Sequence, residues 1–129
     1  VLDLDRDRDE DWMLTQVATH VVASEELAVQ KGGVDALLAQ LQALGVFAAV
    51  TLGAQGVAYA GGHLPAHPVQ VRDTTGAGDV FHGAFTLALA EGQNEVAALR
   101  FASATAALHC AQASPPRRDE VRAFLASLP

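Results

Sequence analysis

Apolar residues in the first half of the chain alternate between the spacing of strands and the spacing of helices. Three short apolar runs predict strands, and the first of them alternates with polar residues: Val1–Asp5, His20–Ala23 and Val46–Leu52. Between these runs, helical spacing predicts one helix around Trp12–Thr19 and a second that begins at Ser24–Glu26 and ends at Gly45. The Ser24 hydroxyl is expected to cap the second helix, because a serine oxygen accepts a hydrogen bond from a free N–H group of the first turn.

Turn residues change the predicted topology after the third strand. Glycines at 53, 56, 61 and 62 punctuate a short strand at Val57–Ala60, which we expect to join the sheet in antiparallel orientation. An extended run, Val69–Val71, then precedes a series of helices separated by turn residues: Val80–Ala90, a helix through Gln112 that Asn94 is expected to cap, and a short last helix that Asp119 opens. The order βαβαβ, hairpin and helices predicts a layered α/β fold with a mostly parallel sheet, in a single domain over residues 1–129.

The composition fits an ordinary globular domain and excludes several classes of protein. Of the 129 residues, 50% are hydrophobic and 18% are charged, which excludes disordered and collagen-like chains. The net charge of −7 and the single lysine, Lys31, argue against nucleic-acid binding. No apolar run approaches the ~20 residues of a membrane span, and the lone Cys110 excludes an internal disulfide, so we expect a cytoplasmic protein. Because the chain opens on Val1 and not on Met, we also expect a fragment or a processed chain.

The most informative segment is Asp73–Asp79, with the sequence DTTGAGD, just before the predicted Val80–Ala90 helix. Its two glycines let the backbone approach a ligand closely. The free N–H groups of the new helix point at that ligand together with the positive end of the helix dipole. The segment therefore predicts an anion site, with a plain tight turn as the alternative.

Two common phosphate-binding motifs do not fit this turn. The dinucleotide fingerprint would need glycine where the chain has Phe81, and the Walker loop would need lysine where it has Ala84. What distinguishes the turn is Asp79, a carboxylate in the first helical turn, where it would repel a phosphate. Accepting a proton from an attacking hydroxyl group would explain a carboxylate at that position.

Residues Asp73–Phe85 closely resemble the signature of the ribokinase-like (PfkB) carbohydrate kinases. Upstream, Thr51–Gly56 resembles the nucleotide-side turn of that family. Ser24–Glu26 lies beside the family's Asn-x-x-Glu motif, with Glu26 at the acidic position and Ala23 in place of the asparagine. The resemblance runs in order over nearly the whole chain. It implies a layered α/β/α ribokinase-like fold, of which this chain is the C-terminal, nucleotide-binding and catalytic portion without the N-terminal half.

The resemblance also implies roles for individual residues. Asp79 would be the base that takes a proton from the sugar hydroxyl, and Glu26 would act on Mg²⁺ through water. The anion hole for the transferred phosphoryl group would consist of the N–H groups of Gly76, Ala77, Gly78 and Asp79. The ATP side would be lined by Thr51, Gly53, Gly56, Ala102, Ser103 and Ala106. Asp73 and Thr75 match positions that bind a monovalent cation in many relatives, but the loop Cys110–Pro115 lacks the glycine of those relatives, which argues against potassium dependence.

The predicted function is ATP-dependent phosphorylation of a sugar hydroxyl, with Mg²⁺ as the cofactor. The partners would be ATP and a small sugar, not a nucleic acid or a membrane, and a homodimer is left open. Two alternatives stay open, a nucleoside kinase of the same family and a non-catalytic nucleotide-binding or regulatory module. The charge of Asp79 argues against the module, because a mere anion site would bind better without it. Since the family recognises its sugar largely through its N-terminal part, the isolated chain is expected to be a poor kinase.

Two histidines and an acidic cluster are candidates for a metal site. His63 and His67 have i, i+4 spacing, but Pro65 between them argues against a helix, so we expect them in a surface loop. The acidic run Asp3–Asp11 is explained mainly by a solvated strand end and by carboxylates at a helix start.

Two further histidines lie on predicted helices. His109 and Cys110 are neighbours whose side chains would point about 100° apart, which argues against a thiol–imidazole pair and predicts Cys110 as a small buried apolar residue. His82 follows Asp79 by three positions, so it is expected either to touch the ligand or to pack against the fold.

Overall fold

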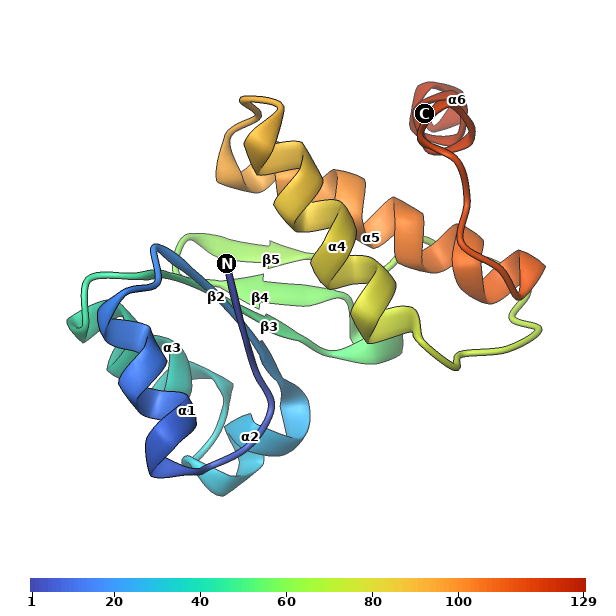
Figure 1. Ribbon diagram of the computed structural model, residues 1–129. Helices are drawn as coiled ribbons and strands as arrows, with labels where there is room; N and C mark the ends of the chain where they lie inside the picture. The colour runs from blue at the N-terminus through green and yellow to red at the C-terminus, as the bar shows by residue number, and fades with distance from the viewer. The chain divides into compact units, whose positions relative to one another are not determined.

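The computed structural model describes residues 1–129 and consists of two compact units, Val1–Pro65 and Ala66–Pro129. The first unit contains the whole β-sheet and the first helices, and the second contains the three long C-terminal helices (Figure 1). No helix combines the length and the apolar composition needed to cross a bilayer.

The first unit is organised around a five-stranded sheet whose strands follow in sequence order. The strands are β1 (Leu2–Leu4), β2 (His20–Ser24), β3 (Phe47–Thr51), β4 (Val57–Tyr59) and β5 (Gly62–Leu64). β2 pairs parallel with both β1 and β3, while β4 and β5 form an antiparallel hairpin at the β3 edge. The prediction of an α/β fold whose parallel strands are extended by an antiparallel hairpin is confirmed.

The core of this unit lies where the central strands meet two helices, α2 (Glu25–Gln30) and α3 (Val34–Ala43). The spacing of apolar residues on α3 turns one stripe inward, as expected for an amphipathic helix. The fully buried side chains of the cluster include Leu4, Val21, Leu27, Leu37, Leu41 and Val50.

Two helix predictions in this unit are wrong in their bounds. The helix expected around Trp12–Thr19 is a short helix α1 (Asp9–Met13) followed by a 3₁₀ turn η1 (Leu14–Gln16). The helix expected from Ser24 to Gly45 is two helices, because Gly32 and Gly33 take φ values of +92° and +115° that an α-helix cannot contain.

The predicted Ser24 cap is confirmed, since its hydroxyl accepts a hydrogen bond from the Leu27 N–H at 3.3 Å. Gly45 follows the end of α3 in the left-handed region, with φ +81°, which confirms the predicted helix end at this residue.

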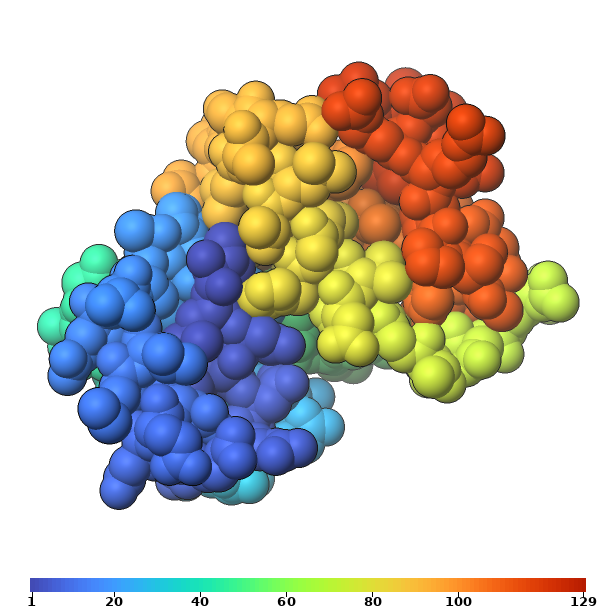
Figure 2. Space-filling model, viewed as in Figure 1, coloured from blue at the N-terminus to red at the C-terminus, as the bar shows by residue number.

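The second unit consists of α4 (Ala77–Ala90), α5 (Glu95–Gln112) and α6 (Arg118–Ser127). α4 and α5 pack along each other, and their buried side chains include Phe81, Phe85, Ala88, Ala98 and Leu99. α6 packs on α5 and buries only Val121, so most of its surface is open (Figure 2).

Three expectations for this unit need correction. Val69–Val71 is irregular and belongs to no strand, so the turn that follows is entered from a loop. α4 begins at Ala77 and not at Val80, which leaves Asp79 in its first turn as predicted. α6 begins at Arg118, one residue before Asp119.

α5 is capped by Asn94, as the sequence predicted. The Asn94 side chain accepts a hydrogen bond from the Ala97 N–H at 2.9 Å. We expect Asn94→Ala to lower the free energy of unfolding by about 1 kcal/mol, because it leaves that N–H without an acceptor. Asn94→Asp keeps the acceptor and serves as the control. Urea denaturation of the two variants measures the difference, and equal midpoints would contradict a capping role.

Candidate active site

The glycine turn, residues 73–79, starts α4 through one left-handed residue. Gly76 has φ +79° and ψ +4°, a conformation that glycine adopts without the steric cost paid by other residues. The helix ladder begins immediately afterwards, because the Val80 N–H donates to the Gly76 carbonyl at 2.9 Å. The chain therefore passes from loop to helix at a single residue, Gly76.

Of the four N–H groups of residues 76–79, one donates a hydrogen bond within the protein and three do not. The Ala77 N–H donates to the Thr74 carbonyl at 3.1 Å. The N–H groups of Gly76, Gly78 and Asp79 have no acceptor within the protein, and all three residues are exposed. Free N–H groups at the positive end of a helix of 14 residues form a site suited to an anion.

Asp79 adds a carboxylate to the same helical turn. It is exposed and forms no hydrogen bond or ion pair through its side chain, so no internal partner explains the charge. A free carboxylate beside free N–H groups combines a proton acceptor with donors for an anion. This is the chemistry that transfer of a phosphoryl group to a hydroxyl requires.

Asp73 shapes the approach to the turn. Its carboxylate accepts a hydrogen bond from the Thr75 N–H at 2.9 Å. That bond is the main reason why the pKa of Asp73 lies below its ordinary value, and the nearby His109 lowers the pKa further. Asp73 therefore stays ionised while it holds the turn in place.

The C-terminal end of α5 forms hydrogen bonds with the glycine turn and with the residue before it. The backbone N–H groups of Arg72 and Asp73 both donate to the Cys110 carbonyl, at 2.8 and 3.1 Å. The His109 Nε2 atom lies 2.6 Å from the Thr75 carbonyl oxygen. This contact was not predicted from the sequence, and no local signal could have revealed it, because the two residues are 34 positions apart.

Cys110 is half-buried, and so more exposed than the buried residue that the sequence predicted. Burial raises the pKa of its thiol, with a further contribution from the negative charge of Asp73. A thiol with a raised pKa is a poor nucleophile at neutral pH. The neighbouring His109 is engaged with Thr75, so the two residues do not act as a pair.

The predicted nucleotide-side turn lies in the first unit, between β3 and β4. Thr51 ends β3, and its hydroxyl donates to the Ala23 carbonyl at 3.4 Å. Gly53 and Gly56 both have positive φ, +55° and +91°, and frame the short 3₁₀ turn η2 (Gly53–Gln55). His63 Nε2 contacts the Gln55 carbonyl at 2.5 Å, so β5 holds this turn in place.

Glu26 is the second residue of α2 and is exposed, with no hydrogen bond or ion pair through its side chain. The protein contains no group of three His, Cys, Asp or Glu side chains that could hold a metal by themselves. Mg²⁺ usually keeps several waters and is bound by one or two carboxylates together with substrate phosphates. A single free carboxylate therefore fits Mg²⁺ that is held jointly by the protein and ATP.

The residues predicted to flank adenine lie on α5. Ala102 is fully buried, whereas Ser103 and Ala106 are half-buried. The surface available to a ligand on this stretch of α5 therefore belongs to Ser103 and Ala106.

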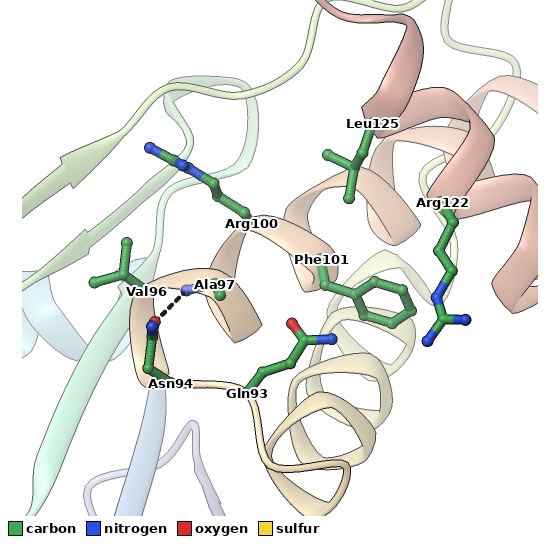
Figure 3. A pocket seen from close by; sticks show the side chains of 8 residues that line it. All are labelled: Gln93, Asn94, Val96, Ala97, Arg100, Phe101, Arg122 and Leu125. Carbon is green, nitrogen blue, oxygen red and sulfur yellow. Dashed lines mark hydrogen bonds between the residues drawn. The ribbon is translucent and has the colours of Figure 1, made fainter.

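A separate groove of about 570 Å³ lies where the α4–α5 turn, α5 and α6 meet (Figure 3). Its lining residues are Gln93, Asn94, Val96, Ala97, Arg100, Phe101, Arg122 and Leu125. In Figure 3 the Phe101 ring and the Arg122 guanidinium face Gln93, while the Arg100 side chain points away. Arg122 is paired with Glu91 at 3.4 Å, and the groove contains none of the predicted site residues.

The histidines at positions 63, 67 and 82 lie in different surroundings. His67 is half-buried and packs edge-on against Phe124, with ring centroids 5.5 Å apart, and burial lowers its pKa. His82 lies one turn after Asp79 on α4, and its Nδ1 atom is buried without a partner. His63 is exposed on β5 and not in a loop as expected, whereas His67 lies in a loop, and neither belongs to a group of three side chains that could hold a metal.

The family model for pfkB family carbohydrate kinases matches residues 14–117. Among curated proteins, the ribokinase of Bacillus subtilis is 48% identical over 84 residues, which cover 59% of this chain and 29% of that protein. Among solved structures, a ribokinase from Thermotoga maritima has a TM-score of 0.80 at 33% identity and covers 97% of this chain and 48% of its own. The ribokinase of Arabidopsis thaliana, complexed with ribose and ATP, has a TM-score of 0.77 at 32% identity and covers 95% and 46%.

These matches confirm the ribokinase-like fold class predicted from the motifs. The chain spans less than a third of the curated relative and about half of each solved one.

Proposed function

The chain belongs to the pfkB family of carbohydrate kinases, and we propose that it forms the nucleotide-binding and catalytic portion of an ATP-dependent kinase that phosphorylates a sugar hydroxyl. One observation carries the proposal: three N–H groups without an acceptor stand beside the unpaired carboxylate of Asp79 at the start of α4. Together they offer donors for the phosphoryl oxygens and an acceptor for the proton of the hydroxyl.

In the proposed reaction Asp79 accepts the proton of the acceptor hydroxyl as its oxygen attacks the γ-phosphorus of ATP. The new bond joins that oxygen to phosphorus, the bond from phosphorus to the bridging oxygen breaks, and ADP leaves. The N–H groups of Gly76, Gly78 and Asp79 donate hydrogen bonds to the phosphoryl oxygens, whose negative charge they stabilise. The Ala77 N–H can join them only by sharing its bond to Thr74.

The other predicted residues serve ATP and its metal. Ser103 and Ala106 flank adenine with their exposed atoms, and Ala102 supports them from within α5. The nucleotide-side turn contributes Thr51, Gly53 and Gly56. Glu26 would hold Mg²⁺ through water, and the metal, when bound, would offset the charge of the phosphates.

The test is an ATP-consumption screen on the complete gene product that contains this chain, with pentoses, hexoses and nucleosides as acceptors. We expect Mg²⁺-dependent ADP formation that requires one acceptor class, and a phosphorylated acceptor in equal amount. ATP binding without turnover on any acceptor would favour the non-catalytic module. A nucleoside as the sole acceptor would favour the nucleoside kinase.

A further inference from the structure

His109 occupies an unusual position for a polar side chain. It is only 7% exposed, in the last turn of α5, and its Nε2 atom contacts the Thr75 carbonyl at 2.6 Å. A carbonyl oxygen only accepts hydrogen bonds, so Nε2 must carry the proton. Nδ1 is then left buried, and it has no partner.

The unpartnered Nδ1 atom argues against a role for His109 in packing alone. Burying a polar atom without a hydrogen bond destabilises a protein, and an apolar side chain at position 109 would avoid this cost. The contact with Thr75 is therefore the feature that the imidazole provides and an apolar residue could not.

We infer that His109 is a positioning residue that aims the Gly76 N–H at the phosphoryl group, an inference that rests on the proposed kinase function. The Thr75 carbonyl and the Gly76 N–H belong to one planar peptide unit, and the chain contains no cis peptide bond. In a trans unit the two bonds point in opposite directions. Holding the carbonyl toward α5 therefore turns the Gly76 N–H away from α5.

The hydrogen bond between His109 and the Thr75 carbonyl matters because the next residue is glycine. The orientation of this peptide unit depends on φ of Gly76, and glycine populates positive and negative φ with similar ease. No other hydrogen bond reaches the Thr75 carbonyl. The bonds to the Cys110 carbonyl and to the Asp73 carboxylate come from the N–H groups of Arg72, Asp73 and Thr75, which all precede that carbonyl along the chain. His109 is thus the one side chain that fixes this peptide unit.

A matched pair of variants in the complete gene product tests the inference. His109→Gln keeps an N–H donor near the position of Nε2, whereas His109→Leu fills similar space without a donor. We expect His109→Leu to lower kcat about 10- to 100-fold and to weaken ATP binding about tenfold, with the KM for the acceptor unchanged. His109→Gln should stay within about threefold of the wild type. Thermal melting shows that both are folded.

The outcomes separate this inference from the proposed function. A kinase in which His109→Leu retains wild-type kcat and ATP affinity would overturn the positioning role and leave the function intact. Equal losses in both variants would also overturn it, because the donor would not matter. If no kinase activity exists, but His109→Leu alone weakens ATP binding by calorimetry, the role of His109 stands and the proposed function fails.

Discussion

Asp79→Asn should lower kcat of the complete gene product by at least about 100-fold, the usual scale for a positioned general base. The amide keeps the shape of the side chain but loses the negative charge and the ability to take up a proton. Asp79 has no internal hydrogen bond or ion pair, so the substitution disrupts no contact of the fold. ATP affinity should be kept or should rise, because the carboxylate repels the γ-phosphate and the amide does not.

Asp119→Asn is the matched control for Asp79→Asn. Asp119 is an exposed carboxylate in the first turn of α6, so its substitution removes a similar charge at a helix start that has no proposed part in the reaction. Steady-state kinetics and an ATP titration on both variants decide the question. Turnover by Asp79→Asn close to that of Asp119→Asn would reduce Asp79 to a helix-start residue and remove the main support for a kinase.

The features that were predictable from sequence are those that depend on a few neighbouring residues. The caps at Ser24 and Asn94 each require one side chain and the N–H three residues later, and both appear as expected. The glycine stop at Gly45 is equally local. The error at Gly32 and Gly33 arose because the apolar spacing on both sides suggests a single helix, whereas the backbone of two adjacent glycines breaks it.

The candidate site was predictable only in part, for the same reason. The glycine turn and Asp79 lie within seven consecutive residues, so their pattern is visible in the sequence. The contact between His109 and Thr75 depends on how α5 ends beside the loop before α4, which no spacing in the sequence encodes. Which N–H groups are free also required coordinates, because the bond from Ala77 to Thr74 removes one of the four expected donors.

The two glycines of the turn should respond to the same substitution in different ways. Gly76→Val forces a β-branched residue into the left-handed region at φ +79° and places its Cβ 3.6 Å from His109 Nε2. We expect a loss of about 1–2 kcal/mol in the free energy of unfolding, together with loss of turnover. Gly78 has ordinary helical backbone, and a Cβ there would meet no atom within 4 Å. Gly78→Val should therefore leave the melting temperature nearly unchanged.

Activity of Gly78→Val should nevertheless fall by at least about 100-fold in kcat/KM for ATP, the scale seen when one donor of an anion hole is lost. Side chains on a helix lean toward its N-terminus, so valine at position 78 leans into the space where the phosphate must approach the free N–H groups. Gly83→Val is the control, because Gly83 lies on the same helix with equally open space around its Cβ but away from the glycine turn. It should keep both stability and turnover. Since Gly78→Val introduces no clash within the protein, its loss of activity would mean that the open space at the turn is filled by the substrate. Kinetics of Gly78→Val matching those of Gly83→Val would instead mean that the glycine serves only the backbone of the turn.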